Sequence, residues 1–105
     1  MSTFFRLSQV IARRTLIEFY TQNTQSTEAL EEWFHKTTKA EWKSFADVKK
    51  TFNTVSSVGN HRYVFNIKGN DYRLITIIKF RPSFVYIRFI GTHSDYDRIK
   101  DIENI

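Results

Sequence analysis

The spacing of apolar residues changes near Val58, and this change limits the possible folds more than any other feature of the sequence. Upstream, apolar residues recur every three or four positions, as on one face of a helix. Downstream, Tyr63, Phe65 and Ile67 occupy every second position, which is typical of a strand, and Gly69-Asn70 then supplies a hairpin turn. The sequence therefore predicts an α+β fold in which N-terminal helices pack on a small antiparallel sheet.

The first half of the chain is expected to form a short strand and three helices. An apolar run at residues 3–7 predicts the strand, and Ser8 can cap a helix over residues 8–20. A second helix is expected over residues 27–38, where acids come early and lysines late, as the helix dipole favours. A third, shorter helix is expected over residues 44–51.

The second half is expected to form three strands, over residues 62–67, 72–80 and 84–90. The middle strand is apolar on both faces, which predicts a central position in the sheet. Pro82-Ser83 then ends this strand. The last segment, residues 93–102, is expected to be a short helix or turn that Thr92 or Ser94 caps.

Length and composition indicate a single domain, residues 1–105, with enough apolar residues for one core. The absence of cysteine excludes a disulfide framework, a thiolate nucleophile and a cysteine zinc site. No apolar run approaches the roughly 20 residues of a membrane helix, and Arg13 and Arg14 interrupt the start too early for a signal peptide. We therefore expect a cytoplasmic protein without a membrane contact.

Positive charge is concentrated in the strand region. The chain has a net charge of +5, and the residues between Gly59 and His93 include only one acid, Asp71. A positive field on one sheet suggests a polyanionic partner such as RNA, although each charge taken alone is typical of a solvated surface. Besides Arg73, the basic residues of this region, and thus the predicted RNA-binding set, are Arg62, Lys68, Lys79, Arg81 and Arg88.

Three histidines are candidates for proton transfer, because RNA cleavage through its own 2′-hydroxyl needs a proton acceptor, a proton donor and cations at the phosphate. His93 follows the last strand, and Tyr96 lies one helical turn later on the same side. His61 stands at the entrance to the first strand of the meander, whereas His35 follows Trp33 and Phe34 in the second expected helix and is expected to be structural. Such cleavage requires neither a metal nor a cofactor. The alternative for His93 is a turn histidine that caps backbone groups.

Arg73 lies inside an apolar strand, where a guanidinium is costly unless it is paired or opens into a cleft. Its planar donors suit two phosphate oxygens at once. The alternative is a structural salt bridge to Asp71, Asp95 or Asp97.

An ordered set of motifs resembles the HigB-type toxin family, which belongs to the RelE-like group of type II toxin-antitoxin systems. The resemblance covers nearly the whole chain. Its motifs are Trp42-Lys43-Ser44, Asp47-Val48-Lys49, residues 63–67, Gly69-Asn70, Tyr72-Arg73-Leu74, residues 86–89, Gly91-Thr92-His93 and Tyr96-Asp97.

This resemblance implies a RelE-like fold and an mRNA interferase activity, that is, a metal-independent endoribonuclease that cuts translated mRNA on the ribosome. It also implies a helix-turn-helix antitoxin as partner. By motif, Arg73 matches the phosphate-binding arginine of the group, His93 the position of a catalytic histidine or basic equivalent, and Tyr96 a stretch where an aromatic residue is common. At Lys68, by contrast, many relatives have a glycine.

Two other classes of function fit the same residues. The basic sheet suits a non-enzymatic RNA-binding module, and it also suits a protein-binding domain with an acidic partner. Substitution of His93 and Arg73 separates the enzyme from both alternatives.

Overall fold

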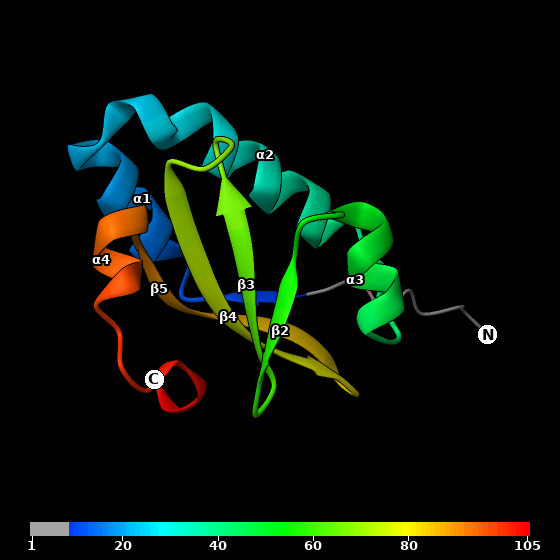
Figure 1. Ribbon diagram of the computed structural model, residues 1–105. Coiled ribbons are helices and arrows are strands. Elements are labelled where there is room, and N and C mark those ends of the chain that lie inside the picture. The colour runs from blue at the N-terminus through cyan, green and yellow to red at the C-terminus, as the bar shows by residue number, and fades with distance from the viewer. Residues whose placement is uncertain (1–8) are drawn as a thin grey trace.

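The computed structural model describes residues 9–105, and these residues combine helices with a five-stranded, mostly antiparallel sheet of order β1-β5-β4-β3-β2 (Figure 1). The α+β class predicted from the sequence is confirmed. The strands are β1 (Gln9–Ile11), β2 (Ser56–Gly59), β3 (Arg62–Ile67), β4 (Tyr72–Phe80) and β5 (Ser83–Thr92). The helices are α1 (Arg13–Gln22), α2 (Thr27–Thr38), α3 (Phe45–Thr51) and α4 (His93–Asp97), with short 3₁₀ helices η1 (Thr24–Ser26) and η2 (Ile102–Asn104).

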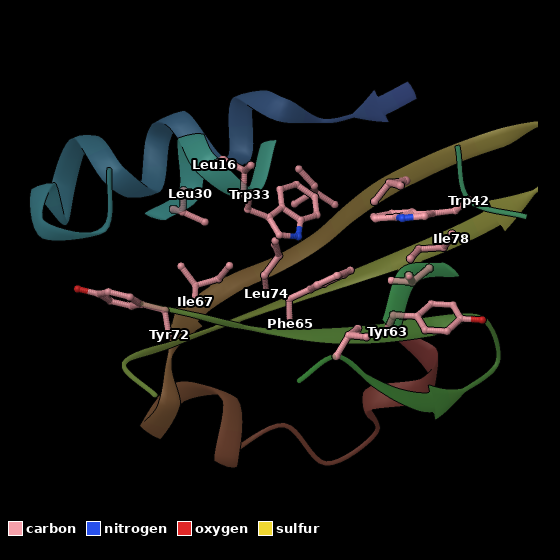
Figure 2. Packing of buried hydrophobic residues seen from close by; sticks show 14 residues of the cluster. Leu16, Leu30, Trp33, Trp42, Tyr63, Phe65, Ile67, Tyr72, Leu74 and Ile78 are labelled. Carbon is pink, nitrogen blue, oxygen red and sulfur yellow. The ribbon is translucent and has the colours of Figure 1, made fainter. Parts of the chain in front are cut away.

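The main core lies between α1, α2 and one face of the sheet. Leu16 of α1 and Leu30 of α2 point toward the even-numbered side chains of β4, such as Leu74 (Figure 2). Trp33 meets Phe65 of β3 edge to face, with ring centroids 5.4 Å apart. Strand β4 is the middle strand of the sheet and packs under this apolar layer. Its apolar side chains on both faces had predicted this central position.

The start of the chain differs from the sequence prediction. Gln9–Ile11, which was expected to be helical, forms β1 and pairs in parallel with β5. Ala12 then takes a left-handed backbone conformation, with φ of 70°, and α1 begins only at Arg13. A tertiary strand pairing has therefore overridden the local helical spacing. The strand predicted at residues 3–7 lies outside the described residues, and so does the cap predicted at Ser8.

Most other element boundaries agree with the sequence within one or two residues, and α2 spans the predicted residues. Strand β2 was not predicted, because its residues, Ser56–Gly59, are few and mostly exposed and show no alternation. The predicted cap of the last helix is Thr92, whose Oγ1 accepts a hydrogen bond of 3.1 Å from the backbone N–H of Asp95.

The second face of the sheet carries the C-terminal part of the chain. There α4 and η2 lie on the side opposite α1 and α2 (Figures 1 and 2). Val64 and Ile75, whose exposed fractions are 4% and 0%, are buried outside the main core cluster. Arg62 of β3 anchors the final residue by donating hydrogen bonds of 2.6 and 3.2 Å to the Ile105 carbonyl oxygen. None of the helices in residues 9–105 is long and apolar enough to cross a membrane.

Candidate functional site

Arg73 is a nearly buried cation on the second face of the sheet. Its exposed fraction is 9%. Its Nη2 atom donates to Oδ1 of Asn70 over 2.8 Å, and its Nη1 atom donates to the backbone oxygens of Asn70 and Tyr72 over 3.3 and 3.2 Å. All three acceptors are neutral, so they orient the guanidinium without cancelling its charge. A buried, oriented and unneutralised guanidinium is suited to an anionic ligand.

The alternative for Arg73, a structural salt bridge, does not form within residues 9–105. Each carboxylate that was considered for it has another partner: Asp71 lies 3.5 Å from Lys68, Asp95 3.0 Å from Arg98, and Asp97 3.0 Å from His93. The charge of Arg73 therefore lacks a carboxylate among the residues that the structure describes.

His93 is fixed at the end of the sheet where Arg73 lies. The register of β4 and β5 pairs Arg73 with Gly91, two residues before His93. The backbone N–H of His93 donates to the Asp71 carbonyl over 3.1 Å, and its Nδ1 atom lies 3.0 Å from Oδ2 of Asp97. The backbone of His93 is thus anchored to Asp71, and its imidazole is held by a carboxylate one helical turn later.

Tyr96 completes this cluster from α4. The Cζ atom of Arg73 lies 5.9 Å from the centroid of the Tyr96 ring, within the usual range of a cation–π contact. Strand β4 and the adjoining helix α4 therefore bring a cation and an aromatic ring together, with His93 at the start of the same helix. Together with Asn70 and Asp97, we call Arg73, His93 and Tyr96 the Arg73 site.

His61 does not lie at the Arg73 site. It belongs to the turn between β2 and β3, where its φ is 63° and its carbonyl oxygen accepts from the backbone N–H of Ile78. Arg73 pairs with Asn66 at the other end of β3. His61 and Asn66 are five residues apart along this strand, which is about 16 Å. The positions of His61 and His93 in the sequence did not indicate that His61 lies away from the Arg73 site.

The predicted RNA-binding cations are distributed over the sheet. Lys68 lies in the turn next to the Arg73 site and contacts Asp71. Arg62, in contrast, is engaged with the C-terminal residue. Lys79 and Arg81 lie at the far end of β4, where Arg81 lines a hollow of about 370 Å³ together with Lys43.

Arg88 lies between these two ends of the sheet. It falls where the register of β4 and β5 shifts, and its Cζ atom lies 5.1 Å from the centroid of the Tyr86 ring. The interleaving of arginine and tyrosine that the sequence suggested on this strand is therefore present.

Two residues of the site were not identified from the sequence. Asn70 was assigned only to a turn, yet its side chain and main chain both hold Arg73. Asp97 was considered only as a salt-bridge partner of Arg73, yet it contacts His93. The sequence signal that could have identified Asp97 was its position four residues after His93 in a short helix, which places both side chains on one face.

Comparison with known proteins supports the class that the fold and site suggest, a small RelE-like toxin. Residues 26–99 match the family model described as HigB_toxin, RelE-like toxic component of a toxin-antitoxin system. Because this match spans more than half of the chain, the protein belongs to the HigB toxin family, and the family predicted from the sequence motifs is confirmed.

Curated relatives match a shorter segment. The mRNA interferase toxin HigB of Escherichia coli (strain K12) is 43% identical over 35 residues, which are 33% of this chain and 34% of the relative. The proteins called mRNA interferase HigB in Escherichia coli O157:H7 and Shigella flexneri match to the same extent. The matched segment thus spans about a third of the length of these relatives.

Proposed function

We propose that this protein is an mRNA interferase, an endoribonuclease toxin that cuts mRNA on the ribosome. The observation that carries the proposal is the buried guanidinium of Arg73, which has neutral hydrogen-bond acceptors and lies beside Tyr96. The names of the curated relatives support the same activity.

In this proposal the 2′-hydroxyl of the substrate attacks the neighbouring phosphorus, the P–O5′ bond breaks, and the products are a 2′,3′-cyclic phosphate and a 5′-hydroxyl. Arg73 binds the phosphate and stabilises the charge that develops on its oxygens. Since Asp97 contacts Nδ1 of His93, the Nε2 atom carries out one of the two proton transfers. Tyr96 orients the nucleotide beside Arg73. No metal ion or cofactor takes part in these steps.

The remaining parts of the proposal concern partners and organisation. A cognate helix-turn-helix antitoxin binds the toxin, and mRNA and the ribosome are its targets in the cytoplasm. The chain forms one toxin domain with the helices of its N-terminal half packed on the sheet in the RelE-like manner. Lys68, Lys79, Arg81 and Arg88 contribute to docking on RNA, which predicts a steep loss of affinity with salt.

The test is cleavage of a defined mRNA on purified ribosomes by the parent and by the Arg73→Ala and His93→Ala variants. Loss of a group that transfers a proton lowers the rate by roughly a hundredfold or more. His35→Ala is a matched control, because His35 is exposed on α2 and belongs to no part of the Arg73 site. His61→Ala is expected to cut normally, since about 16 Å of strand separates His61 from Asn66, the partner of Arg73.

Folded Arg73→Ala and His93→Ala variants that cut as fast as the parent would show that the catalytic assignment is wrong. Ribosome association without any cleavage by the parent protein would support the non-enzymatic binding module instead.

A further inference from the structure

Two exposed apolar side chains meet on the face of the sheet that carries Arg73. The exposed large hydrophobic residues in the described part of the chain are Ile11, Ile17 and Tyr86, at 39%, 38% and 36%. Ile11 and Tyr86 are direct register partners between β1 and β5, so their side chains lie on the same face. Tyr86 also pairs with Ile77 of β4, which alternates in phase with Arg73. The apolar row therefore faces the same way as the Arg73 site.

A guanidinium borders this row. The register of β4 and β5 shifts between Ile75 and Thr76, which leaves Arg88 as an extra residue on β5. Its guanidinium lies 5.1 Å from the Tyr86 ring centroid, and no ion pair to Arg88 occurs within residues 9–105. The bulge thus places an unneutralised cation over an exposed aromatic ring.

Phe89 continues the same strand toward the Arg73 site. A Cβ atom built on Gly91 would lie 2.6 Å from Cζ of Phe89, so the Phe89 ring lies against the Gly91 backbone. Gly91 is itself the register partner of Arg73. Along β5 the surface therefore runs from Tyr86 and Arg88 through the Phe89 ring to the guanidinium of Arg73.

We propose that this part of β5 binds single-stranded RNA that extends from the Arg73 site, with one base stacked on Tyr86 and a backbone phosphate on Arg88. This inference rests on the proposed function, because it extends the RNA that Arg73 would hold. Tyr86 pairs with Ile77, four residues along β4 from Arg73, which places the stacking position about 13 Å from the phosphate site.

The chemistry of the surface favours RNA over a protein partner. Aromatic rings that alternate with guanidinium groups bind successive bases and phosphates of a flexible strand, because every base has a stacking face. Neither Arg73 nor Arg88 has a carboxylate partner within residues 9–105. A nucleic acid supplies a negatively charged phosphate at every nucleotide and can therefore pair with both arginines.

The test measures affinity for a fluorescent oligouridine in which every sugar is 2′-O-methylated, so that no 2′-hydroxyl can attack. A second oligomer has the same sugar–phosphate chain without bases. Tyr86→Ala is expected to weaken binding of the base-bearing oligomer about tenfold and to leave binding of the abasic oligomer unchanged. Tyr86→Phe keeps the ring and should bind within about twofold of the parent.

Two further variants separate stacking from other effects. Ile17→Ala removes an equally exposed apolar side chain from α1 and should change neither affinity. Arg88→Ala should weaken both oligomers and lower the slope of log affinity against log salt by about 0.7, the value for one phosphate contact on a single strand.

The inference is overturned if Tyr86→Ala binds both oligomers like the parent, or weakens both equally. It is also overturned if Tyr86→Ala loses only the antitoxin, which would make this row a protein interface. Because the oligomers are not cut, the result is independent of catalysis. If binding depends on the bases while the Arg73→Ala and His93→Ala variants still cut normally, RNA binding by β5 is supported and the catalytic assignment is refuted.

Discussion

The Oδ1 atom of Asn70 accepts a hydrogen bond of 2.8 Å from Nη2 of Arg73, three residues later in the chain. The backbone carbonyl of Asn70 accepts a second one, from Nη1 over 3.3 Å. The turn that connects β3 to β4 therefore sets the orientation of the guanidinium before any ligand arrives. An arginine that is already oriented loses less side-chain entropy when it binds a phosphate.

Asn70→Ala is predicted to lower the cleavage rate roughly fivefold, because Arg73 loses one orienting contact worth about 1 kcal/mol. Asn70→Asp is predicted to lower it further. The aspartate keeps the shape and the acceptor, but its charge neutralises the guanidinium and competes with the phosphate. Single-turnover cleavage of ribosome-bound mRNA measures both effects, and Asn53→Ala, an exposed asparagine beyond α3, is the control. A faster or unchanged Asn70→Asp enzyme would indicate that Arg73 has a structural role only.

Asp97→Asn is predicted to lower the cleavage rate roughly tenfold while affinity for the ribosome stays unchanged. The carboxylate lies 3.0 Å from Nδ1 of His93, and a neutral amide in its place orients the imidazole less strongly. Asp95→Asn serves as the control, because Asp95 is on the same short helix but contacts Arg98. Equal rates for the two variants would exclude an orienting role for Asp97.

The parts of the fold that local pattern determines were predictable from the sequence. Helix α2 has its apolar stripe, its early acids and its late lysines within one continuous segment. The central position of β4 follows from apolar side chains on both faces. In both cases the residues that decide the structure are neighbours in the chain.

The parts that depend on distant pairing were not predictable. Gln9–Ile11 has helix-like spacing, but its partner strand lies more than 70 residues away, at Phe84–Tyr86. The engagement of Arg62 by Ile105 is likewise invisible in a local pattern. For the site, the sequence suggested Arg73, His93 and Tyr96 but gave no distance between them and His61, because that distance depends on which end of β3 each residue approaches.

Glu31→Gln is predicted to destabilise the folded protein by about 1 kcal/mol at neutral pH. Glu31 of α2 accepts a hydrogen bond of 2.6 Å from the Tyr20 hydroxyl of α1 and contacts Arg13 over 3.2 Å. The Tyr20 hydrogen bond, followed by the positive charge of Arg13, lowers the pKa of Glu31 below its ordinary 4.5.

The direction of the pH dependence follows from that shift. A carboxyl whose pKa is lower in the folded state stabilises the fold above the unfolded pKa, and this stability is lost as the pH falls through the folded value. Urea unfolding at a series of pH values should therefore show the difference between the parent and Glu31→Gln shrinking below about pH 4.5. Glu32→Gln, which removes only an exposed pair with Lys36, should have little effect. A pH-independent difference would contradict the assignment.

Gly91→Ala tests the close contact on β5. The new Cβ atom would lie 2.6 Å from Cζ of Phe89 and 3.2 Å from its Cε2 atom, so the ring must move or the strand must shift. Overpacking of this kind typically costs about 1–3 kcal/mol. Thermal or urea unfolding of Gly91→Ala, Phe89→Ala and the double variant gives the coupling between the two positions. Because the clash vanishes when the ring is absent, the double variant should be more stable than the sum of the single effects predicts by about 1 kcal/mol. Additive effects would show that the Phe89 ring does not lie against Gly91 in solution.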